Sequence, residues 1–351
     1  MRSRTVLRRS DRSKGLSAGM AVLLALPGLM TCAPAHAGAF AFVTNQNSSD
    51  LSVLDLGART EIRRVPVPGK PAGVAVTPSL GSFFTVSPDS KTLRRFSLAT
   101  CTETASLQLP GGPTGIAVAA KVEQESGEQA PKSLIFVSDW YNARLHVVDA
   151  ASFRLIRELE TGSAPAGIAV AADQSWVASA DRDANQVSFF SLPDLDPIGQ
   201  VPVGERPYGL ATAPDGRLHV ANVGSNSVSV IDPGRLAVIA EVPVGERPYG
   251  VAFASGRAFV TDQYADTLSI YGLADLKPET VLDVGEYPEG IQATPTGDLI
   301  VSTNWFSNTV SLTDPKSLEV TGEIETGDGP RAFGQFIAEF PEGDTPCRAS
   351  N

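Results

Sequence analysis

Cysteine and histidine are scarce in this sequence, with three of each among 351 residues. It contains no Cys-x-x-Cys-His segment for covalent haem, no paired cysteines for zinc and no glycine-rich phosphate loop. After residue 37 only His146 and His219 remain, and both fall inside expected strands. Asp181 begins a calcium-type loop, but Gln186 and Leu192 stand where the turn glycine and the bidentate acid are needed. The sequence therefore predicts no metal site, no cofactor and no catalytic residue.

Long apolar runs are also missing, apart from one near the N-terminus. That run, Ala18–Met30, follows an Arg-rich segment and precedes Ala35-His36-Ala37. A basic segment, a short apolar run and an Ala-x-Ala site are typical of a secretory signal, and the run is too short to span a bilayer. We expect residues 1–37 to be a signal cleaved after Ala37, which predicts a periplasmic or secreted protein. A twin-arginine signal and a lipoprotein site at Cys32 fit less well.

Positive charge is in deficit. The formal net charge is −11, and loss of residues 1–37 removes six basic residues and one acidic residue, which leaves −16. A strongly anionic surface keeps a secreted protein soluble and repels phosphate backbones. Nonspecific nucleic-acid binding is therefore not expected, and no segment after the leader is apolar enough to cross a membrane as a helix.

A repeat fills the rest of the chain. Seven times a small polar or acidic residue, here called the cap residue, is followed 26 positions later by a proline. A fixed offset inside a period of roughly forty residues indicates a repeat architecture. The seven pairs are Asn45/Pro71, Ser87/Pro113, Asp139/Pro165, Asp181/Pro207, Asn222/Pro248, Asp262/Pro288 and Asn304/Pro330.

Each repeat contains four short runs rich in Val and Ile, separated by Asn, Asp, Gly and Pro. In the fifth repeat these runs are Leu218–Ala221, Ser227–Asp232, Ala237–Val244 and Gly250–Phe253. Such runs predict strands and turns, and no segment sustains a helical period. Four antiparallel strands repeated seven times predict an all-β fold, a seven-bladed β-propeller of four-stranded antiparallel blades.

The propeller is expected to occupy residues 38–338, followed by a C-terminal tail over 339–351. The chain begins at the second strand of a blade, so its last strand completes the first blade in a three-plus-one closure. Closure removes the free sheet edges, and we expect a monomer. We place the closing strand at Arg331–Ile337. The last repeat departs from the usual Gly-x-Ala start with Arg331-Ala332-Phe333-Gly334, which predicts a distortion there.

The repeat resembles a known family. Phe42-Val43-Thr44-Asn45, Phe259-Val260-Thr261-Asp262 and the twice-used Val-Pro-Val-Gly-Glu-Arg-Pro-Tyr-Gly (201–209 and 242–250) are similar to the YVTN-type β-propeller repeat. The resemblance covers all seven units. It implies a propeller like the large subunit of quinoprotein amine dehydrogenases and the haem d1 domain of cytochrome cd1. Because the repeat is structural, it implies little about chemistry.

Loop lengths separate two faces of the expected propeller. The distance from cap residue to proline never changes, whereas the distance from proline to the next cap residue does. The constant face carries the turns between second and third strands and the connections between blades. The variable face carries the other turns, including the longest one, Ala120–Lys132, which is expected to be a solvated loop.

Aromatic residues and arginines gather on the constant face, although loops are not where aromatic residues usually concentrate. Aromatic and Arg side chains around a concave axis suit recognition. The tyrosines could instead pack adjacent blades, and the acidic cap residues could only satisfy turn amides. The predicted binding residues are Trp140, Tyr264, Trp305, Arg206, Arg247, Arg331, Tyr208 and Tyr249.

Two cysteines remain after the leader, Cys101 and Cys347. Cys101 is expected in a turn of the second repeat on the variable face, where the C-terminal tail also emerges. The ten residues from Ile337 to Cys347 can span at most ~35 Å, enough to reach the neighbouring blade. In an oxidising compartment this predicts a disulfide between them.

The leading functional hypothesis is a noncatalytic propeller that binds a protein partner or a small anionic ligand on its constant face. A second hypothesis is an enzyme or an accessory of a periplasmic quinoprotein or cytochrome oxidoreductase system. A metal-dependent lactonase is a third. The enzyme hypotheses require convergent His, Asp and Glu residues or a cofactor anchor near the axis, and the residues beside the axial prolines include Lys70, Arg206, Arg247 and Glu289 instead.

Overall fold

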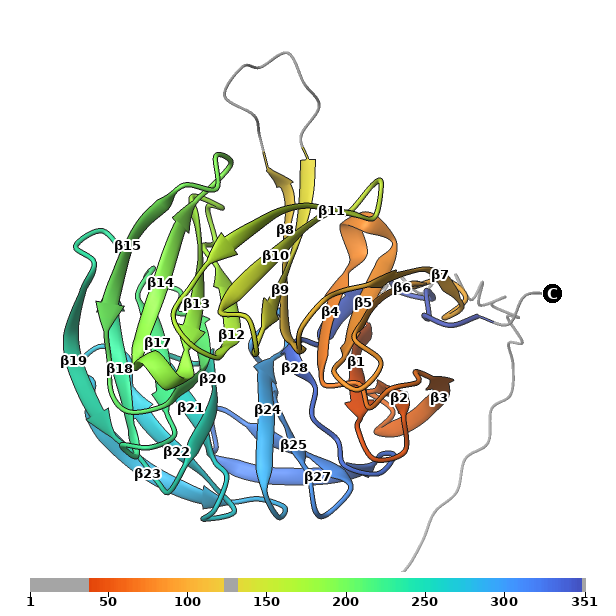
Figure 1. Cartoon of the computed structure of the whole chain (residues 1–351). Helices are drawn as coiled ribbons and strands as arrows, with labels where there is room; N and C mark the ends of the chain where they lie inside the picture. The colour runs from red at the N-terminus through yellow and green to blue at the C-terminus, as the bar shows by residue number, and fades with distance from the viewer. Residues whose placement is uncertain (1–37, 123–131, 349–351) are drawn as a thin grey trace, which may run out of the picture. The chain divides into compact units, whose positions relative to one another are not determined.

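The computed structural model describes residues 38–122 and 132–348, which form seven sheets arranged around a common axis (Figure 1). Six sheets have four strands and one has five, and the only helices in the described part are two 3-10 turns, η1 (Pro78–Leu80) and η2 (Arg182–Ala184). The predicted all-β seven-bladed propeller is therefore confirmed. The expected signal at 1–37 and most of the Ala120–Lys132 loop lie outside the described residues.

The first three blades contain the strands listed here in chain order. Blade 1 has β1 (Gly38–Asn45), β2 (Asp50–Asp55), β3 (Thr60–Pro66) and β29 (Ile337–Phe340); blade 2 has β4 (Gly73–Thr77), β5 (Ser82–Ser87), β6 (Thr92–Ser97), β7 (Glu103–Gln108) and β28 (Phe333–Gln335); blade 3 has β8 (Pro113–Val122), β9 (Lys132–Asp139), β10 (Arg144–Asp149) and β11 (Arg154–Glu160).

The remaining blades are regular and contiguous in sequence. Blade 4 has β12 (Pro165–Val170), β13 (Trp176–Asp181), β14 (Gln186–Ser191) and β15 (Pro197–Pro202); blade 5 has β16 (Pro207–Thr212), β17 (Leu218–Asn222), β18 (Ser227–Asp232) and β19 (Ala237–Pro243); blade 6 has β20 (Pro248–Ala254), β21 (Arg257–Asp262), β22 (Thr267–Gly272) and β23 (Pro278–Asp283); blade 7 has β24 (Pro288–Ala293), β25 (Ile300–Asn304), β26 (Thr309–Asp314) and β27 (Glu319–Glu325).

The ring closes as expected, but through a different strand. β29 pairs antiparallel with β1, with Phe40 opposite Ala338, so the three-plus-one closure is confirmed. The placement of the closing strand at Arg331–Ile337 was wrong. Pro330 bridges Asn45, and the chain then leaves blade 1, so that β28 pairs in parallel with β4 of blade 2.

A missing glycine accounts for this departure. In the other six repeats the second residue after the proline is Gly, and a Cβ there would lie close to the next inner strand; for Gly209 it would be 2.1 Å from the carbonyl oxygen of Tyr249, and for Gly290 2.2 Å from that of Arg331. Only glycine tolerates such close approach of two backbones. In the last repeat that position is Ala332, which adopts φ of +46°, and the chain turns away from blade 1.

Each cap residue is buried and contacts the residue seven positions later on the third strand of its own blade. We call this contact the cap pair, and the seven distances run from 2.5 to 3.2 Å. The pairs are Asn45/Ser52, Ser87/Arg94, Asp139/His146, Asp181/Ser188, Asn222/Ser229, Asp262/Ser269 and Asn304/Ser311.

The cap pair also holds the incoming connection between blades. The backbone N–H of Gly162 donates to Asp181 at 2.8 Å, and that of Gly245 donates to Ser269 at 2.9 Å. The residue four positions after the cap residue accepts, through its backbone carbonyl, a hydrogen bond from the connection to the next blade. For example, the carbonyl of Asn185 accepts from the N–H of Val203 at 3.0 Å. These hydrogen bonds hold both ends of the segment that runs from the cap residue to the proline. The length of this segment therefore cannot vary, which explains the constant 26-residue spacing.

The cap pairs balance their charge blade by blade. In blade 5 the cap residue is Asn222, and Ser229 donates onward to Glu241 at 2.5 Å. In blade 6 the cap is acidic, and an apolar residue, Val281, faces Ser269 across the ladder. In blade 3 both ends are acidic, and His146 lies between them, 3.2 Å from Asp139 and 3.2 Å from Glu158. In blade 3 the histidine thus separates the buried carboxylate of Asp139 from the partly exposed carboxylate of Glu158.

Cys101, in the β6–β7 turn, forms a disulfide with Cys347, with Cα atoms 4.7 Å apart. The bond joins the C-terminal segment that follows β29 to blade 2. Its ends are separated by 246 residues in sequence. A crosslink at this place restrains the closing strand of the ring, and a native disulfide typically contributes about 2–4 kcal/mol.

Asp262 provides a test of the cap pairs. Burial raises the pKa of this carboxyl to about 6, against the hydrogen bonds from Ser269 and Thr267. The pKa of Asp262 in the folded state exceeds the ordinary value of 3.8, so the protonated carboxyl stabilises the fold. This contribution to the free energy of unfolding is complete below pH 3.8 and is lost as the pH rises through 6. Asp262→Asn should remove this loss, because Asn is the cap residue in other blades. The free energy of unfolding of the variant relative to the parent should rise by about 2–3 kcal/mol between pH 3.5 and 7.5.

Urea denaturation at the two pH values measures this difference, with the exposed Asp283→Asn as the control. Equal pH dependence in the parent protein and Asp262→Asn would contradict the assignment.

Candidate binding face

Beneath the constant face, the axis of the propeller is filled by aromatic side chains from three inner segments. Tyr208 is the second residue of β16, Tyr249 is the second residue of β20, and Phe333 is the first residue of β28. The ring centroids are 4.2 Å apart for Tyr208 and Tyr249, 5.1 Å for Tyr208 and Phe333, and 5.9 Å for Tyr249 and Phe333. All three side chains are buried. Burial raises the pKa of both tyrosines, so they remain uncharged at neutral pH.

A buried ion pair lies beside these rings. Nε of Arg331 is 2.9 Å from Oε2 of Glu289, whose side chain is 1% exposed, and Gln263 donates to the other carboxylate oxygen at 2.8 Å. Burial raises the pKa of Glu289, and the Arg331 guanidinium opposes this shift. We call Tyr208, Tyr249, Phe333, Glu289 and Arg331 the axial core.

Three of the predicted binding residues, Tyr208, Tyr249 and Arg331, thus lie in the axial core. The two tyrosines pack on each other and on Phe333, as the alternative interpretation proposed for the tyrosines, and Arg331 pairs with Glu289. The sequence reasoning did not include Phe333 or Gln263. The departure from the repeat at Arg331–Gly334 was the available signal for Phe333, whereas Gln263 had none.

Other aromatic residues form a row on the same face, with exposed rings at its two ends and a half-buried one between them. We call Tyr264, Tyr287 and Phe306 the aromatic arc. Tyr264 and Phe306 follow the cap residues of blades 6 and 7, and Tyr287 lies in the connection between those blades. The ring centroids of Tyr264 and Tyr287 are 5.5 Å apart, and those of Tyr287 and Phe306 are 4.8 Å apart. Tyr264 is 47% exposed and Phe306 is 62% exposed.

Two arginines stand in the same row of connections. The Arg247 guanidinium lies 4.1 Å from the centre of the Tyr264 ring, and Arg206 is exposed one connection earlier. Within residues 38–122 and 132–348 neither guanidinium has an acidic side chain within 4.0 Å. Arg206, Arg247 and Tyr287 adopt φ of +54°, +55° and +60°, the left-handed conformation that Lys70 and Ala164 also have at this position of their connections.

The two predicted tryptophans lie at the margin between the axial core and the surface. Trp140 is half-buried, 6.1 Å from the Tyr208 ring and beneath Arg182, and Trp305 is half-buried beneath Arg331 at 4.6 Å. The neighbouring Tyr141 is 78% exposed. The structure therefore brings Tyr264 and Arg247 together on the surface, and it connects Trp140, Trp305, Tyr208, Tyr249 and Arg331 through the axial core.

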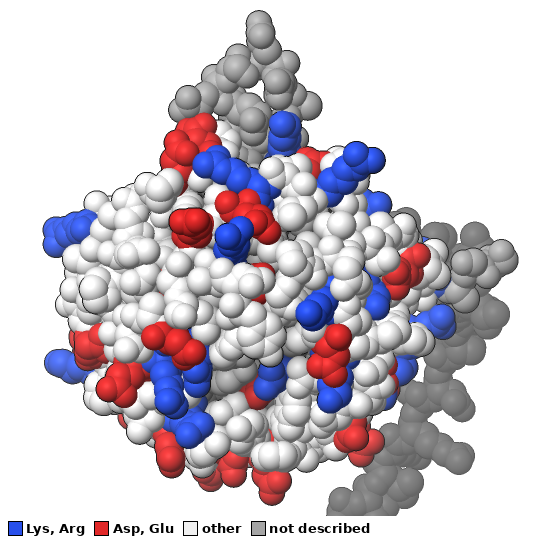
Figure 2. Space-filling view, viewed as in Figure 1, with Lys and Arg blue, Asp and Glu red and all other residues white. Residues whose placement is uncertain are grey.

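The described residues contain no group of three or more His, Cys, Asp or Glu side chains placed to hold a metal ion. His219 is buried and 2.6 Å from the Tyr271 hydroxyl, and burial lowers its pKa to about 4. In the same described part no helix is long and apolar enough to cross a bilayer. Figure 2 shows basic and acidic side chains interspersed over the face it displays, without an extended basic area.

Comparison with known proteins supports the fold. No protein-family model matches the chain, and no curated protein matches its sequence. Similar solved structures include a functionally unknown protein from Desulfotomaculum acetoxidans (14% identity, TM-score 0.70, 86% of this chain and 98% of that chain) and Kuenenia stuttgartiensis hydrazine synthase (15%, 0.67, 79% and 92%). A streptogramin B lyase structure is also similar (18%, 0.61, 75% and 89%). At these identities the similarity shows the fold alone.

The ion pair of the axial core can be tested by breaking it from one side. Glu289→Gln leaves the Arg331 charge without its counter-ion, and we expect the free energy of unfolding to fall by about 3 kcal/mol. The double variant Glu289→Gln/Arg331→Met should lose less, because no unpaired charge remains. Urea denaturation of the two variants and the parent measures both values. A double variant less stable than Glu289→Gln would contradict this role of the pair.

Proposed function

We propose that this protein is exported and acts as a noncatalytic binding protein whose constant face holds a protein partner through the aromatic arc and the unpaired arginines. The observation that carries the proposal is that Arg206 and Arg247 have no acidic partner among the described residues and that Arg247 lies over the exposed Tyr264 ring. Aromatic and Arg side chains are the residue types that contribute most to protein–protein binding energy. No specific contact among the described residues favours the quinoprotein, cytochrome or lactonase hypothesis.

The local backbone does not require the large side chains of these connections. The residue before the axial proline adopts positive φ in connections with quite different side chains, such as Lys70 at +57° and Ala164 at +54°, so this conformation belongs to the repeat. The last connection uses Gly329, with φ of +65°, at the place where the earlier ones have Arg206, Arg247 and Tyr287. Glycine is therefore structurally sufficient there, and the larger side chains are not needed to form the connection.

The arrangement also indicates the chemistry of the partner. A planar guanidinium stacked on a ring keeps its edge N–H groups available for a carboxylate. Arg247 on Tyr264 has this geometry, and Arg206 offers a second cation from the adjacent connection. We expect a partner that places acidic side chains against these two arginines and an apolar group against Phe306.

The experiment separates binding from stability. A photo-crosslinking amino acid at Phe306 should give one discrete adduct with a cellular protein, and the same residue at the exposed Ala58, in the β2–β3 turn, should not. For the protein identified in this way, Arg206→Gly/Arg247→Gly should weaken binding by at least about tenfold. Its midpoint of unfolding should remain close to that of the parent, because glycine suits the local φ.

Crosslinking from Ala58 alone would place the partner on the other face. Unchanged affinity of the double glycine variant would show that the arginines do not contact it, and a large loss of stability would show that they serve packing.

Export has its own test. Intact-mass analysis of the protein recovered from the periplasm or medium should give a chain that begins at Gly38, as cleavage after Ala37 requires. A retained leader, or a lipid-modified Cys32, would contradict the proposed route.

A further inference from the structure

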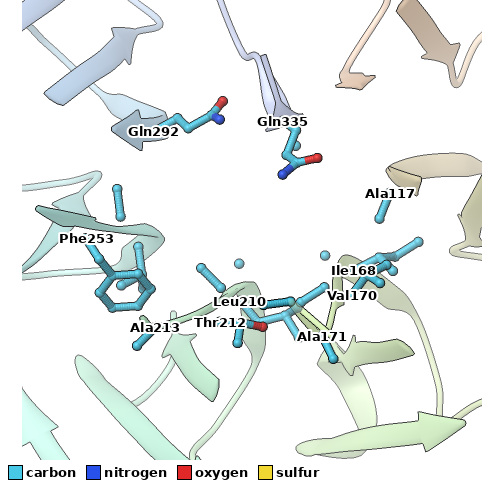
Figure 3. Close-up of a pocket in the computed structure, with 18 of the residues that line it drawn as sticks. Ala117, Ile168, Val170, Ala171, Leu210, Thr212, Ala213, Phe253, Gln292 and Gln335 are labelled. Carbon is cyan, nitrogen blue, oxygen red and sulfur yellow. The ribbon is translucent and has the colours of Figure 1, made fainter. Parts of the chain in front are cut away.

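The propeller contains a large cavity on its axis, separate from the constant face. Its volume is about 1190 Å³. Its walls are the inner strands β8, β12, β16, β20 and β24 together with the segment Ala332–Gln335. Figure 3 shows the side chains of Ala117, Ile168, Leu210 and Phe253 around this space.

The axial core closes the cavity on one side. The lining ends at the glycines near the start of the inner strands, such as Gly209 and Gly250, and at Phe333, which packs on the buried Tyr208 and Tyr249. On the other side the lining includes the β12–β13 and β16–β17 turns, which belong to the variable face. The cavity is therefore a blind pocket that opens on the variable face and does not run through the ring.

The interior carries no charged side chain. The charged residues of the lining lie in turns or, for Asp232, at the end of β18. Each already has a local partner: Asp173 accepts from Ser175, Asp215 pairs with Arg217, and Asp232 accepts from Gly234. A charged group moved into such an interior would lose hydration without gaining a counter-ion. An uncharged and largely apolar occupant fits these walls.

Three amide side chains line the cavity, of which Gln174 lies in the β12–β13 turn at the opening and donates to the carbonyl of Ala120 at 2.8 Å. Gln292 and Gln335 point into the cavity from one side, opposite Leu210 and Thr212 (Figure 3). Oε1 of Gln292 accepts from the backbone N–H groups of Phe336 at 2.7 Å and Ile337 at 2.9 Å. Its oxygen is thereby occupied, and its NH₂ group is the end left to donate. Gln335 is exposed to the cavity and is held there by β28.

We propose that this axial cavity is a second binding site, which takes a neutral, mainly hydrocarbon molecule that carries a carbonyl-type acceptor. The hydrocarbon part contacts the Ala, Val, Ile and Leu side chains of the inner strands. The acceptor receives hydrogen bonds from the amides of Gln292 and Gln335. An apolar pocket with a few convergent polar groups is the usual form of a small-molecule site. The site is independent of the proposed partner surface.

The test uses a neutral fluorescent probe, N-phenyl-1-naphthylamine, with the full mature protein. The probe should bind with a stoichiometry of one and brighten as it enters the apolar cavity. Decan-2-one should displace it, whereas decanoate, with the same chain length and a charge, should displace it at least about tenfold less well, since the carboxylate must be desolvated. If decanoate displaces the probe as well as decan-2-one does, the proposed ligand class is wrong.

Two variants locate the site. Ala117→Phe, which places a ring in the cavity, should weaken probe binding by at least about tenfold through steric overlap with the probe, and Ala58→Phe, the same change at an exposed turn, should not. Probe affinity is measured separately for Gln335→Leu, and relative to that value displacement by decan-2-one should weaken by about 3- to 10-fold, as loss of one hydrogen bond predicts. Circular dichroism confirms that each variant is folded. Unchanged probe affinity in Ala117→Phe, or unchanged relative displacement by decan-2-one in Gln335→Leu, would overturn the proposal.

Discussion

The rest of the structure depends on one buried polar contact that occurs in every blade. The cap residue at the end of the second strand meets the residue seven positions later on the third strand. In six blades the connection from the preceding blade donates to this pair, and in blade 2 Arg94 donates to the carbonyl of Pro68 in the connection. A buried polar group without such a partner is costly. The contact therefore fixes the hairpin, the connection and the register between blades together. The loops of the constant face have nearly constant lengths because hydrogen bonds hold them at both ends.

The closure of the ring is where this regularity ends, and both candidate sites depend on that. Ala332 occupies a place that glycine fills in the other repeats, and the chain crosses towards blade 2 before it completes blade 1. The crossing segment places Phe333 against Tyr208 and Tyr249, which seals the axis on the constant face. It also places Gln335 inside the axial cavity. The crossing segment thus separates the constant face from the axial cavity. In a ring without this departure from the repeat, the two would be continuous along the axis.

The constant face combines rigid support with side chains that folding does not require. The connections are bonded through their backbones, and Arg206, Arg247 and Tyr287 project from positions where Gly329 serves equally well. The backbone of these connections therefore loses little conformational freedom when a partner binds. In the axial core the side chains serve the fold instead. The buried Glu289 carboxylate needs a counter-ion, and Arg331 supplies it.

The sequence by itself determined the number of blades, the four strands of each blade and the three-plus-one closure. These follow from local patterns: alternating apolar residues, turn residues and a spacing that repeats. It also identified the residues of the constant face, but it could not divide them into buried and exposed ones. Tyr208 and Tyr264 both follow turn signals, yet the first points to the axis and the second to the surface, because their positions relative to neighbouring blades differ. The cap pairs, the β28 crossing and the cavity required the tertiary structure, since each joins segments whose proximity is set by the ring and not by sequence neighbours.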